Sequence, residues 1–468
     1  MPATWSQPPA VGVVGGGLAG LAAGCALAQA GFRVRLLERR PYLGGRASSY
    51  QHPGTGEVVD NCQHVLLGCC TNLIDLYRRT GVEDKIRWFD RLTFVEPGGR
   101  QSTLEPSALP PPLHMAPAFL RIPCLELADK LAVIRALAEL APRMPKDKGE
   151  SFLSWLRNRR QTERAIERFW KTILVSALNE DLDRISVPYA AQVIRESFLK
   201  SAAAGRMGVP TVPLTELYNA AGDYIRARGG EVFFRSPVES FRAEAGEVRL
   251  RLADREVVTD FAILAVPFEA VGRLLPETSG AEPLRRSVEQ FEPSPITGIH
   301  LWFDRTISEL DHAVLLDRTI QWMFNKSKLL DRSENGPGGS YIELVVSSAK
   351  SLVEKSLPEI VDLAGQELCE FFPAARGATL LKSTVIKEVH ATYSPRPGLD
   401  LSRPQAVTSW PRVFLAGDWT ATGWPATMEG AVRSGYRAAE ILARMAGVKD
   451  AAFLVPDLPA AGFMRLFR

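Results

Sequence analysis

The sequence predicts an α/β fold, in which a Rossmann-like domain with a parallel sheet is interleaved with an α+β domain made of a mixed sheet plus helices. Two observations support this prediction. Near the N-terminus a short apolar strand, a glycine-rich turn, a helix and a second strand follow one another, as in a βαβ unit. A mainly helical stretch over 96–204 is followed by a further buried strand over 261–266, so the first domain is expected to be assembled from separate pieces of the chain.

The composition excludes several other classes of protein. The 468 residues are 46% apolar and 23% charged, which is typical of a folded globular chain. A net charge of +3, from 56 basic and 53 acidic residues, does not indicate nucleic-acid binding. Six cysteines are too few for a disulfide framework, and we expect an intracellular protein with reduced thiols. The uncharged run over 11–31 has the length of a membrane span, but it is rich in glycine and no basic residue precedes it.

The first predicted strand, Val11–Val14, leads into Gly15-Gly16-Gly17-Leu18-Ala19-Gly20, which fits G-x-G-x-x-G. A helix is predicted over 18–30, and a second strand, Arg33–Leu37, ends at Glu38. The three glycines permit the tight turn, the approach of a pyrophosphate and the packing of helix on strand. The helix N-terminus holds phosphates and the acid accepts hydrogen bonds from ribose hydroxyls, which favours FAD or NAD over NADP. The predicted dinucleotide contacts are Gly15, Gly17, Leu18, Ala19, Gly20 and Glu38.

The segment Arg39-Arg40-Pro41-Tyr42-Leu43-Gly44-Gly45-Arg46 follows directly. It resembles the Gly-Gly-Arg segment that wraps the FAD diphosphate in the flavoprotein superfamily of amine oxidases, phytoene desaturases and protoporphyrinogen oxidases. The segment 229–232 with Val238 resembles that superfamily's adenine-contacting strand, and 413–418 and 428–431 resemble its C-terminal flavin motif. The resemblance implies a Rossmann-like FAD-binding domain. It also implies further FAD contacts at Arg39, Gly45, Arg46, Val238, Gly417, Asp418, Met428, Glu429, Gly430 and Ala431.

Other residues depart from the amine oxidases. The stretch 388–394 lacks the cysteine to which monoamine oxidases attach their flavin, so the FAD is expected to be non-covalent. Thr427 replaces the aromatic wall of the amine site, and the strand over 296–304 offers His300 instead of a lysine. The segment Asp60-Asn61-Cys62-Gln63-His64-Val65-Leu66-Leu67-Gly68 is similar to the signature of the squalene-associated FAD enzymes, the hydroxysqualene dehydroxylases, which usually have glycine at the position of Cys62. This resemblance runs from about residue 10 to 445 and implies FAD contacts at Gln63, His64 and Val65.

The activity implied by this resemblance is the reduction of hydroxysqualene to squalene by reduced FAD, in squalene and hopanoid biosynthesis. Loss of the hydroxyl as water needs a proton, and hydride then quenches the delocalised cation. The candidate proton donors or polar groups at the flavin are His64, Asp60 and His300. Each has an alternative: Asp60 satisfies backbone amides, His64 contacts FAD only through its backbone, or His300 is a core histidine. No metal site is predicted, since Cys62, His64, Cys69 and Cys70 lack zinc-like spacing.

A substrate of this size is expected to arrive from a bilayer, because its transfer through water costs about 0.8 kcal/mol per carbon. The Pro-rich segment 106–117 and an amphipathic helix over 126–141 fit a monotopic membrane contact, although the helix could also be packed on the core. In that helix Leu127, Leu131 and Ile134 share one face, while Asp129, Lys130, Arg135 and Glu139 are expected to stay polar. We expect a cytoplasmic protein, peripherally associated with the inner face of the membrane and in contact with other squalene-pathway enzymes.

The predicted FAD-binding domain comprises residues 1–95, 205–267 and 396–446. The predicted substrate domain comprises 96–204 and 268–395, and residues 447–468 form a hydrophobic tail that lies on the membrane or on the protein. The active site is expected where the two domains meet. Three alternative functions stay open: a carotenoid or phytoene desaturase that uses oxidised FAD, an amine oxidase, and a membrane-associated flavin-binding scaffold without turnover.

Overall fold

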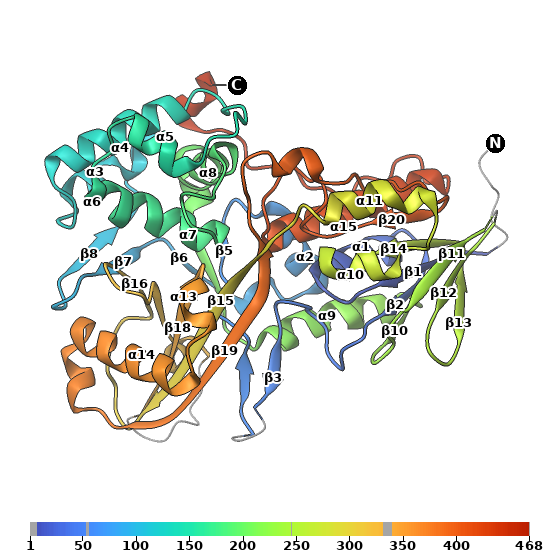
Figure 1. The fold of residues 1–468 in the computed structure, drawn as a ribbon, viewed down its shortest axis with the longest axis horizontal. Helices are drawn as coiled ribbons and strands as arrows, with labels where there is room; N and C mark the ends of the chain where they lie inside the picture. Colours follow the sequence, from blue (N-terminus) through green and yellow to red (C-terminus); the bar gives the residue numbers. More distant parts are fainter. Residues whose placement is uncertain (1–6, 53–55, 245, 331–338, 468) are drawn as a thin grey trace.

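The computed structural model describes residues 7–52, 56–244, 246–330 and 339–467, which form two lobes side by side (Figure 1). One lobe is built on a five-stranded sheet with the order β10-β2-β1-β14-β20, in which every neighbouring pair is parallel. Its strands are β1 (Ala10–Val14), β2 (Arg33–Leu37), β10 (Glu231–Phe233), β14 (Phe261–Leu264) and β20 (Val413–Leu415). The predicted parallel sheet, assembled from three separate parts of the chain, is confirmed.

Alternate residues of β1 face the two layers that cover this sheet. Val11 and Val13 pack on the helices α1 (Leu18–Gln29), α9 (Leu214–Arg226) and α15 (Met428–Met445). The other face packs on the antiparallel sheet of β11 (Ser240–Ala243), β12 (Val248–Arg251) and β13 (Glu256–Thr259). The uncharged run near the N-terminus is therefore the buried core of the lobe. None of the helices in the described part of the chain is long and apolar enough to cross a bilayer.

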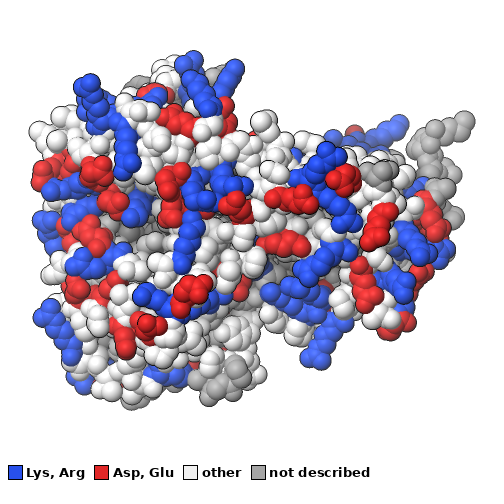
Figure 2. All heavy atoms as spheres, in the orientation of Figure 1, with Lys and Arg blue, Asp and Glu red and all other residues white. Residues whose placement is uncertain are grey.

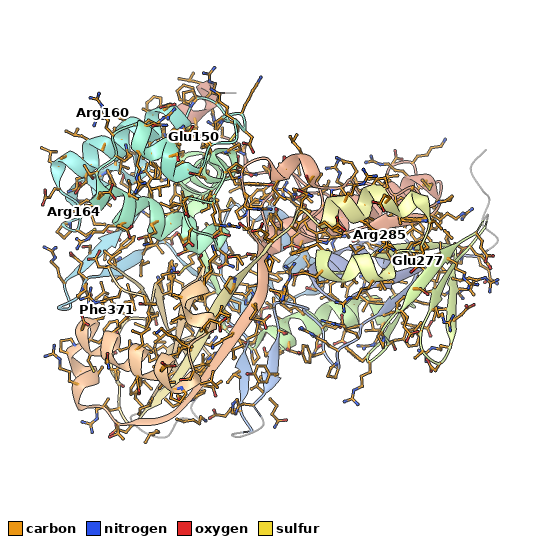
Figure 3. All side chains as sticks on the ribbon, viewed as in Figure 1. Glu150, Arg160, Arg164, Glu277, Arg285 and Phe371 are labelled. Carbon is orange, nitrogen blue, oxygen red and sulfur yellow. The ribbon has the colours of Figure 1, made fainter. Side chains whose placement is uncertain are left out.

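The second lobe is built on a seven-stranded sheet with the order β19-β15-β18-β17-β16-β7-β8. All its neighbouring pairs are antiparallel except β16 and β7. Its strands are β7 (Leu92–Val95), β8 (Gln101–Leu104), β15 (Pro293–Phe303), β16 (His312–Leu315), β17 (Trp322–Asn325), β18 (Ser340–Ser347) and β19 (Leu380–Tyr393). The helix α14 (Leu357–Phe371) covers one face, and its last residue, Phe371, is buried against the sheet (Figure 3).

Helices form a separate layer at the end of this lobe, around their own core and against β7, β8 and β16. They are α3 (Ala116–Arg121), α4 (Leu127–Leu140), α5 (Phe152–Asn158), α6 (Glu163–Ala165), α7 (Thr172–Leu178) and α8 (Val187–Ile194). Short elements connect the lobes: α2 (Thr71–Thr80), β3 (Ser49–Gln51), β4 (Val58–Asp60), β5 (Leu66–Leu67), β6 (Ile86–Phe89) and β9 (Met207–Pro210).

Two expected boundaries differ from the structure. The strand β7 pairs with β16 in the seven-stranded sheet, so the first FAD-binding segment ends before residue 95. The helices α10 (Phe268–Leu274) and α11 (Glu282–Val288) pack in the core of the five-stranded sheet, although residues 268–395 were expected to form the substrate domain. Before α14 the chain forms a separate short helix, α13 (Lys350–Val353), and α14 starts anew because Ser356 caps it and Pro358 occupies its first turn.

The helix α4 carries its apolar face outward. Leu127, Leu131 and Ile134 are 69%, 51% and 42% exposed, so the shared face predicted for them is confirmed. Of the four residues expected to stay polar, Asp129 and Lys130 are buried: Asp129 closes the capping box of α4, and Lys130 Nζ donates to Leu120 O at 2.8 Å. Two charged side chains of this helix thus point into the protein, while Leu127, Leu131 and Ile134 point into solvent.

The tail docks on the protein along its first part. Glu440 accepts hydrogen bonds from the backbone N–H groups of Phe453 and Leu454, and Asn72 bonds both backbone groups of Val455. Near its end the tail crosses the helical layer, where Phe463 N donates to Pro111 O at 2.8 Å. There Phe463 and Leu466 are exposed. Basic and acidic side chains are mixed over the face shown in Figure 2.

Candidate functional site

A cavity of about 660 Å³ lies between the two sheets. At one end its wall is the glycine-rich turn after β1 and the residues that follow β2, at the carboxyl ends of the parallel strands. At the other end its wall is the face of β15, β17 and β18 and the end of α7. Ligands bind at such edges of parallel sheets, and here the edge meets a second domain.

The nucleotide end of the cavity is shaped by backbone. Gly15 has φ +106°, and a Cβ there would lie 2.4 Å from Ala265 O. A Cβ on Gly45 would lie 2.9 Å from the Cα of Gly17, so these two segments touch without side chains. The carboxylate of Glu38 accepts hydrogen bonds from Gly16 N at 2.6 Å and Arg40 N at 2.7 Å, which fixes it beside the turn. This arrangement fits a pyrophosphate on the helix N-terminus and a ribose at Glu38.

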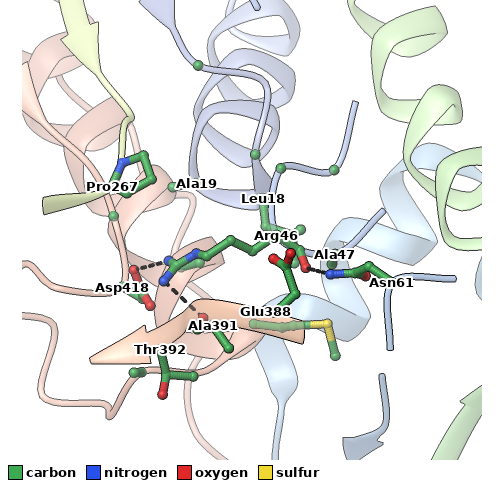
Figure 4. A pocket seen from close by; sticks show the side chains of 18 of the residues that line it. Leu18, Ala19, Arg46, Ala47, Asn61, Pro267, Glu388, Ala391, Thr392 and Asp418 are labelled. Atoms are coloured by element: carbon green, nitrogen blue, oxygen red, sulfur yellow. Dashed lines mark hydrogen bonds and ion pairs between the residues drawn. The ribbon is translucent and has the colours of Figure 1, made fainter. Parts of the chain in front are cut away.

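An ion pair crosses the middle of the cavity wall. Arg46 Nη2 lies 2.5 Å from Asp418 Oδ1, and Arg46 Nη1 donates to Ala391 O at 3.2 Å (Figure 4). Burial lowers the pKa of Arg46. The charge and hydrogen bond of Asp418, together with the charges of Glu269 and Glu388, outweigh burial and raise this pKa, so the guanidinium stays charged. Asp418 follows β20, and the backbone N–H of Gly417 is held by Ser434 Oγ at 2.8 Å. A guanidinium and a carboxylate at this position suit a diphosphate and the hydroxyls of a ribityl chain.

Most of the predicted FAD contacts line this cavity. They are Gly15, Gly17, Leu18, Ala19, Glu38, Arg39, Gly45, Arg46, Gln63, His64, Val65, Val238, Gly417, Asp418, Met428 and Ala431. Gly20 does not line it and has a packing role instead, since a Cβ there would lie 1.9 Å from Gly15 O. Gly430 also stays behind the wall, where its N–H donates to Thr427 Oγ1 at 3.1 Å.

Glu429 was predicted to contact FAD, but it does not line the cavity. On α15 it points away from the cavity that Met428 and Ala431 face. Its buried carboxylate accepts hydrogen bonds from the N–H groups of Asn72 and Leu73, at the start of α2, and pairs with Arg433. Burial raises its pKa. Glu429 therefore fastens α15 to α2.

The three candidate proton donors are placed differently. His64 lines the cavity, and its Nδ1–H donates to Cys62 O at 2.7 Å, which leaves Nε2 as an acceptor. Burial lowers the pKa of His64 and favours this neutral form. Asp60 and His300 lie behind the wall and do not line the cavity, and burial lowers the pKa of His300 to about 3. The carboxylate of Asp60 accepts the backbone N–H of Leu214 at 3.1 Å, which agrees with the alternative role of satisfying a backbone amide.

Sequence reasoning missed three charged residues near this site. Glu388 of β19 lines the cavity near Arg46, and its register partner on β15, Ile296, lines it too (Figure 4). Lys326, at the start of α12 (Lys326–Leu329), and Glu343 of β18 are both fully buried. The single acid within the apolar run Tyr341-Ile342-Glu343-Leu344-Val345-Val346 is a signal that could have pointed to Glu343.

The sheet end of the cavity is apolar. Its walls include Val65, Ile296, Trp322, Phe324 and Val345. The rings of Trp322 and Phe324 are stacked with centroids 5.6 Å apart, and Trp322 Nε1 donates to Ser176 Oγ at 2.7 Å. This end fits a hydrocarbon chain.

The position that forms an aromatic wall in amine oxidases has a different character here. Thr427 lines the cavity, and its hydroxyl caps α15. The nearby Trp424 is buried beneath the guanidinium of Arg433, 4.4 Å from its ring centroid, and does not line the cavity.

Comparisons with known proteins agree with this site. The model of the flavin containing amine oxidoreductase family matches residues 18–443. The chain is 28% identical over 448 residues to the hydroxysqualene dehydroxylase of Rhodopseudomonas palustris, with 92% of this chain and 98% of the relative covered. It is 26% identical over 457 residues to the 15-cis-phytoene desaturase of Synechococcus elongatus, with 93% and 96% covered. The crystal structure of an oxidoreductase from Methanosarcina mazei shares the fold, with a TM-score of 0.70, 18% identity and coverage of 91% and 98%.

Proposed function

The chain belongs to the flavin containing amine oxidoreductase family and is an FAD-dependent oxidoreductase, and within this family we propose that it reduces hydroxysqualene to squalene with loss of water. The observation that carries the proposal is the placement of residues 61–65. This stretch lies within the segment similar to the dehydroxylase signature, and it forms the cavity wall between the FAD-binding residues and the apolar sheet face. The relative named as a hydroxysqualene dehydroxylase supports the same proposal.

Different residues of the cavity wall have different roles in the proposed reaction. When bound, FAD in its reduced form supplies the hydride. The glycine-rich turn, Glu38, Arg46 and Asp418 hold the dinucleotide, and the apolar walls at Trp322 and Phe324 exclude water and hold the hydrocarbon. A dry, apolar wall prevents water from capturing the cation that forms when the hydroxyl leaves.

The substrate hydroxyl leaves as water, which requires a proton. Two side chains of the cavity wall can interact with this hydroxyl. Glu388 lines the cavity near Arg46, so its carboxyl is available to a substrate. We assign the proton transfer to Glu388: its carboxylate takes up a proton from solvent, and this proton then leaves with the hydroxyl as water. The Nε2 acceptor of His64 orients the hydroxyl. Addition of a hydride to the cationic carbon then gives squalene.

A second candidate function is desaturation of a carotenoid precursor with oxidised FAD. The similarity to the phytoene desaturase favours it, and the apolar cavity suits both kinds of substrate. The two candidates differ in the direction of electron flow. Two observations disfavour oxidation of an amine: Thr427 lines the cavity where amine oxidases have an aromatic residue, and the ring of Trp424 packs against Arg433 and does not line the cavity.

The substrate of either reaction is a membrane lipid, and the helical layer offers a surface for reaching it. We call its exposed apolar residues the apolar end: Leu109, Leu113, Leu120, Leu127, Leu131, Ile134, Phe463 and Leu466. The bonds from Lys130 to Leu120 and from Phe463 to Pro111 bring three segments of this layer together. Arg164 (Figure 3) pairs with Glu126, the residue directly before α4, so charged groups lie next to this helix. The apolar end is proposed to rest in the inner face of the membrane, and contact with other squalene-pathway enzymes stays a prediction.

A paired assay tests the proposed function. Hydroxysqualene is given to the chemically reduced protein without oxygen, and phytoene is given to the oxidised protein, each in detergent micelles. Chromatography of the extracted lipids is expected to find squalene in the first reaction and unchanged phytoene in the second. Desaturated products from phytoene, with hydroxysqualene left intact, would replace this function with the desaturase.

A further inference from the structure

Behind the cavity wall lies a buried charge cluster of Asp60, Lys326 and Glu343. Lys326 Nζ is 2.9 Å from Asp60 Oδ2 and 3.3 Å from Glu343 Oε2. The three residues come from β4, α12 and β18, and all of them are buried from solvent. Lys326 Nζ also donates to Gln63 Oε1 at 2.8 Å, and Gln63 lines the cavity. One residue therefore separates the cluster from the cavity.

Asp60 has a full set of hydrogen-bond donors. Its Oδ1 accepts from Ser49 Oγ at 2.7 Å and from Leu214 N at 3.1 Å, and its Oδ2 accepts from Lys326. Burial raises the pKa of Asp60, but Lys326 and these hydrogen bonds outweigh burial and bring it below its usual value. Three donors stabilise the ionised form, so Asp60 is a carboxylate.

Glu343 has a different environment. Among the described residues no donor makes a well-aligned hydrogen bond to either of its carboxyl oxygens, and its cationic neighbour is Lys326. The directly opposite residue on β15 is His300, whose Nδ1 is bonded to Tyr341 and whose buried Nε2 lacks a partner among the described residues. Cys62 and His64, after β4, are the further titratable groups near it.

The charges of the cluster balance only when one carboxyl is protonated. Two carboxylates with one ammonium would leave a net negative charge in a buried site, which is costly. Since Asp60 is ionised by its donors, the proton belongs on Glu343. Burial raises the pKa of Glu343 to about 7, with Lys326 opposing and Asp60 adding to the effect. His300 stays neutral and adds no charge.

We propose that Glu343 is a positioning residue that stores one proton behind the cavity wall, so that the cluster is neutral when Glu343 is protonated and anionic when it is not. Lys326 and Gln63 transmit this charge to the wall against which the flavin is expected. An anionic cluster there opposes the addition of electrons to bound FAD. The inference needs only the FAD site and goes beyond the proposed function, since it holds for reductive and oxidative chemistry alike.

The test is the midpoint potential of the bound flavin, measured by anaerobic dye-coupled titration over a series of pH values. In the wild-type protein the potential is expected to fall more steeply across the range around pH 7 than in Glu343→Gln, which cannot ionise. Glu343→Asp is expected to keep a steep segment, shifted along the pH axis, and it serves as the test if the glutamine variant does not fold. Parallel curves for the wild-type protein and the folded variant would overturn the proposal.

A matched control separates the proton store from a merely structural role. Glu367 of α14 is also a buried carboxylate, but it accepts the backbone N–H groups of Thr319 and Ile320 and does not line the cavity. Glu367→Gln makes the same chemical change outside the cluster and is expected to leave the pH dependence of the potential as in the wild-type protein. An equal flattening in both variants would also contradict the proposal.

Discussion

Arg46 and Asp418 are 372 positions apart in the sequence, yet their side chains meet at 2.5 Å in the cavity wall. Arg46 follows β2 and Asp418 follows β20, so the pair joins the first and last segments of the five-stranded lobe. The carboxylate is almost fully buried and the guanidinium is partly exposed toward the cavity. The same two groups that close the wall are therefore available to the diphosphate and ribityl chain of FAD.

Replacing Arg46 tests this role. Arg46→Met is expected to weaken FAD binding by roughly 10- to 100-fold, because a charge-assisted hydrogen bond contributes about 1.5–3 kcal/mol. Titration of the apoprotein with FAD, followed by flavin fluorescence, measures the affinity. Arg305→Met removes an exposed arginine paired with Asp304 and serves as the control. Unchanged affinity in Arg46→Met would show that the diphosphate lies elsewhere.

Glu388 is the residue on which the proton transfer depends. Glu388→Gln is expected to lower turnover of hydroxysqualene by about 10²- to 10⁴-fold, which is the usual contribution of a general acid, while FAD stays bound. The rate of squalene formation and the flavin absorbance of the purified variant measure both effects. His390→Asn changes an exposed residue on the same strand and should leave the rate unaltered. Full activity of Glu388→Gln would remove Glu388 from the mechanism.

The pH dependence of the free energy of unfolding tests the protonation of Glu343 independently of the flavin potential. Its pKa is raised in the folded protein, so the folded state binds more protons than the unfolded state between the ordinary glutamate value and about 7. Stability is therefore lost as pH rises through this window, by about 1–3 kcal/mol. The lowered pKa values of His64, His114, His300 and His312 contribute the opposite slope.

These histidine contributions largely cancel in the difference between the wild-type protein and Glu343→Gln. Urea unfolding of the two proteins at several pH values is expected to show the variant gaining relative stability as pH rises toward 7. A difference that is constant with pH would mean that Glu343 has the same protonation in both states.

The apolar end is tested with vesicles. The combined variant Leu127→Ser, Leu131→Ser and Ile134→Ser removes three exposed apolar side chains of α4 and is expected to reduce binding by at least about tenfold, since each inserted leucine is worth about 1.5–3 kcal/mol when fully buried. Co-sedimentation with anionic phospholipid vesicles measures the bound fraction. Leu401→Ser with Val407→Ser changes exposed apolar residues elsewhere and is the control. Equal binding by both variants would argue against this surface.

The parts of the fold that depend on local pattern could be predicted from the sequence. The glycines at 15, 17 and 20 sit at fixed spacing between a strand and a helix, so the turn, the neighbouring strands and Glu38 follow from one segment. Glu429 shows the limit of motif transfer, because the side of α15 that it occupies is decided by packing against α2.

Residues brought together by tertiary structure could not be predicted in this way. The pairing of Asp60 with Lys326, 266 positions away, depends on how β4, α12 and β18 meet. Glu388 reaches the cavity because β19 pairs with β15 in one register, which no short motif encodes. For this reason the sequence predicts the glycine-rich turn that receives the dinucleotide, whereas the positions of Lys326, Glu343 and Glu388 around the cavity are known only from the structure.

The most direct measurement follows the flavin itself during a single turnover. The purified protein is reduced without oxygen, hydroxysqualene is added, and the oxidised flavin absorbance is recorded while squalene is quantified. We predict that the oxidised band returns with one squalene formed per flavin, and that Glu388→Gln slows this return. A band that stays bleached with hydroxysqualene, together with bleaching of the oxidised protein by a more saturated isoprenoid, would contradict reductive dehydroxylation.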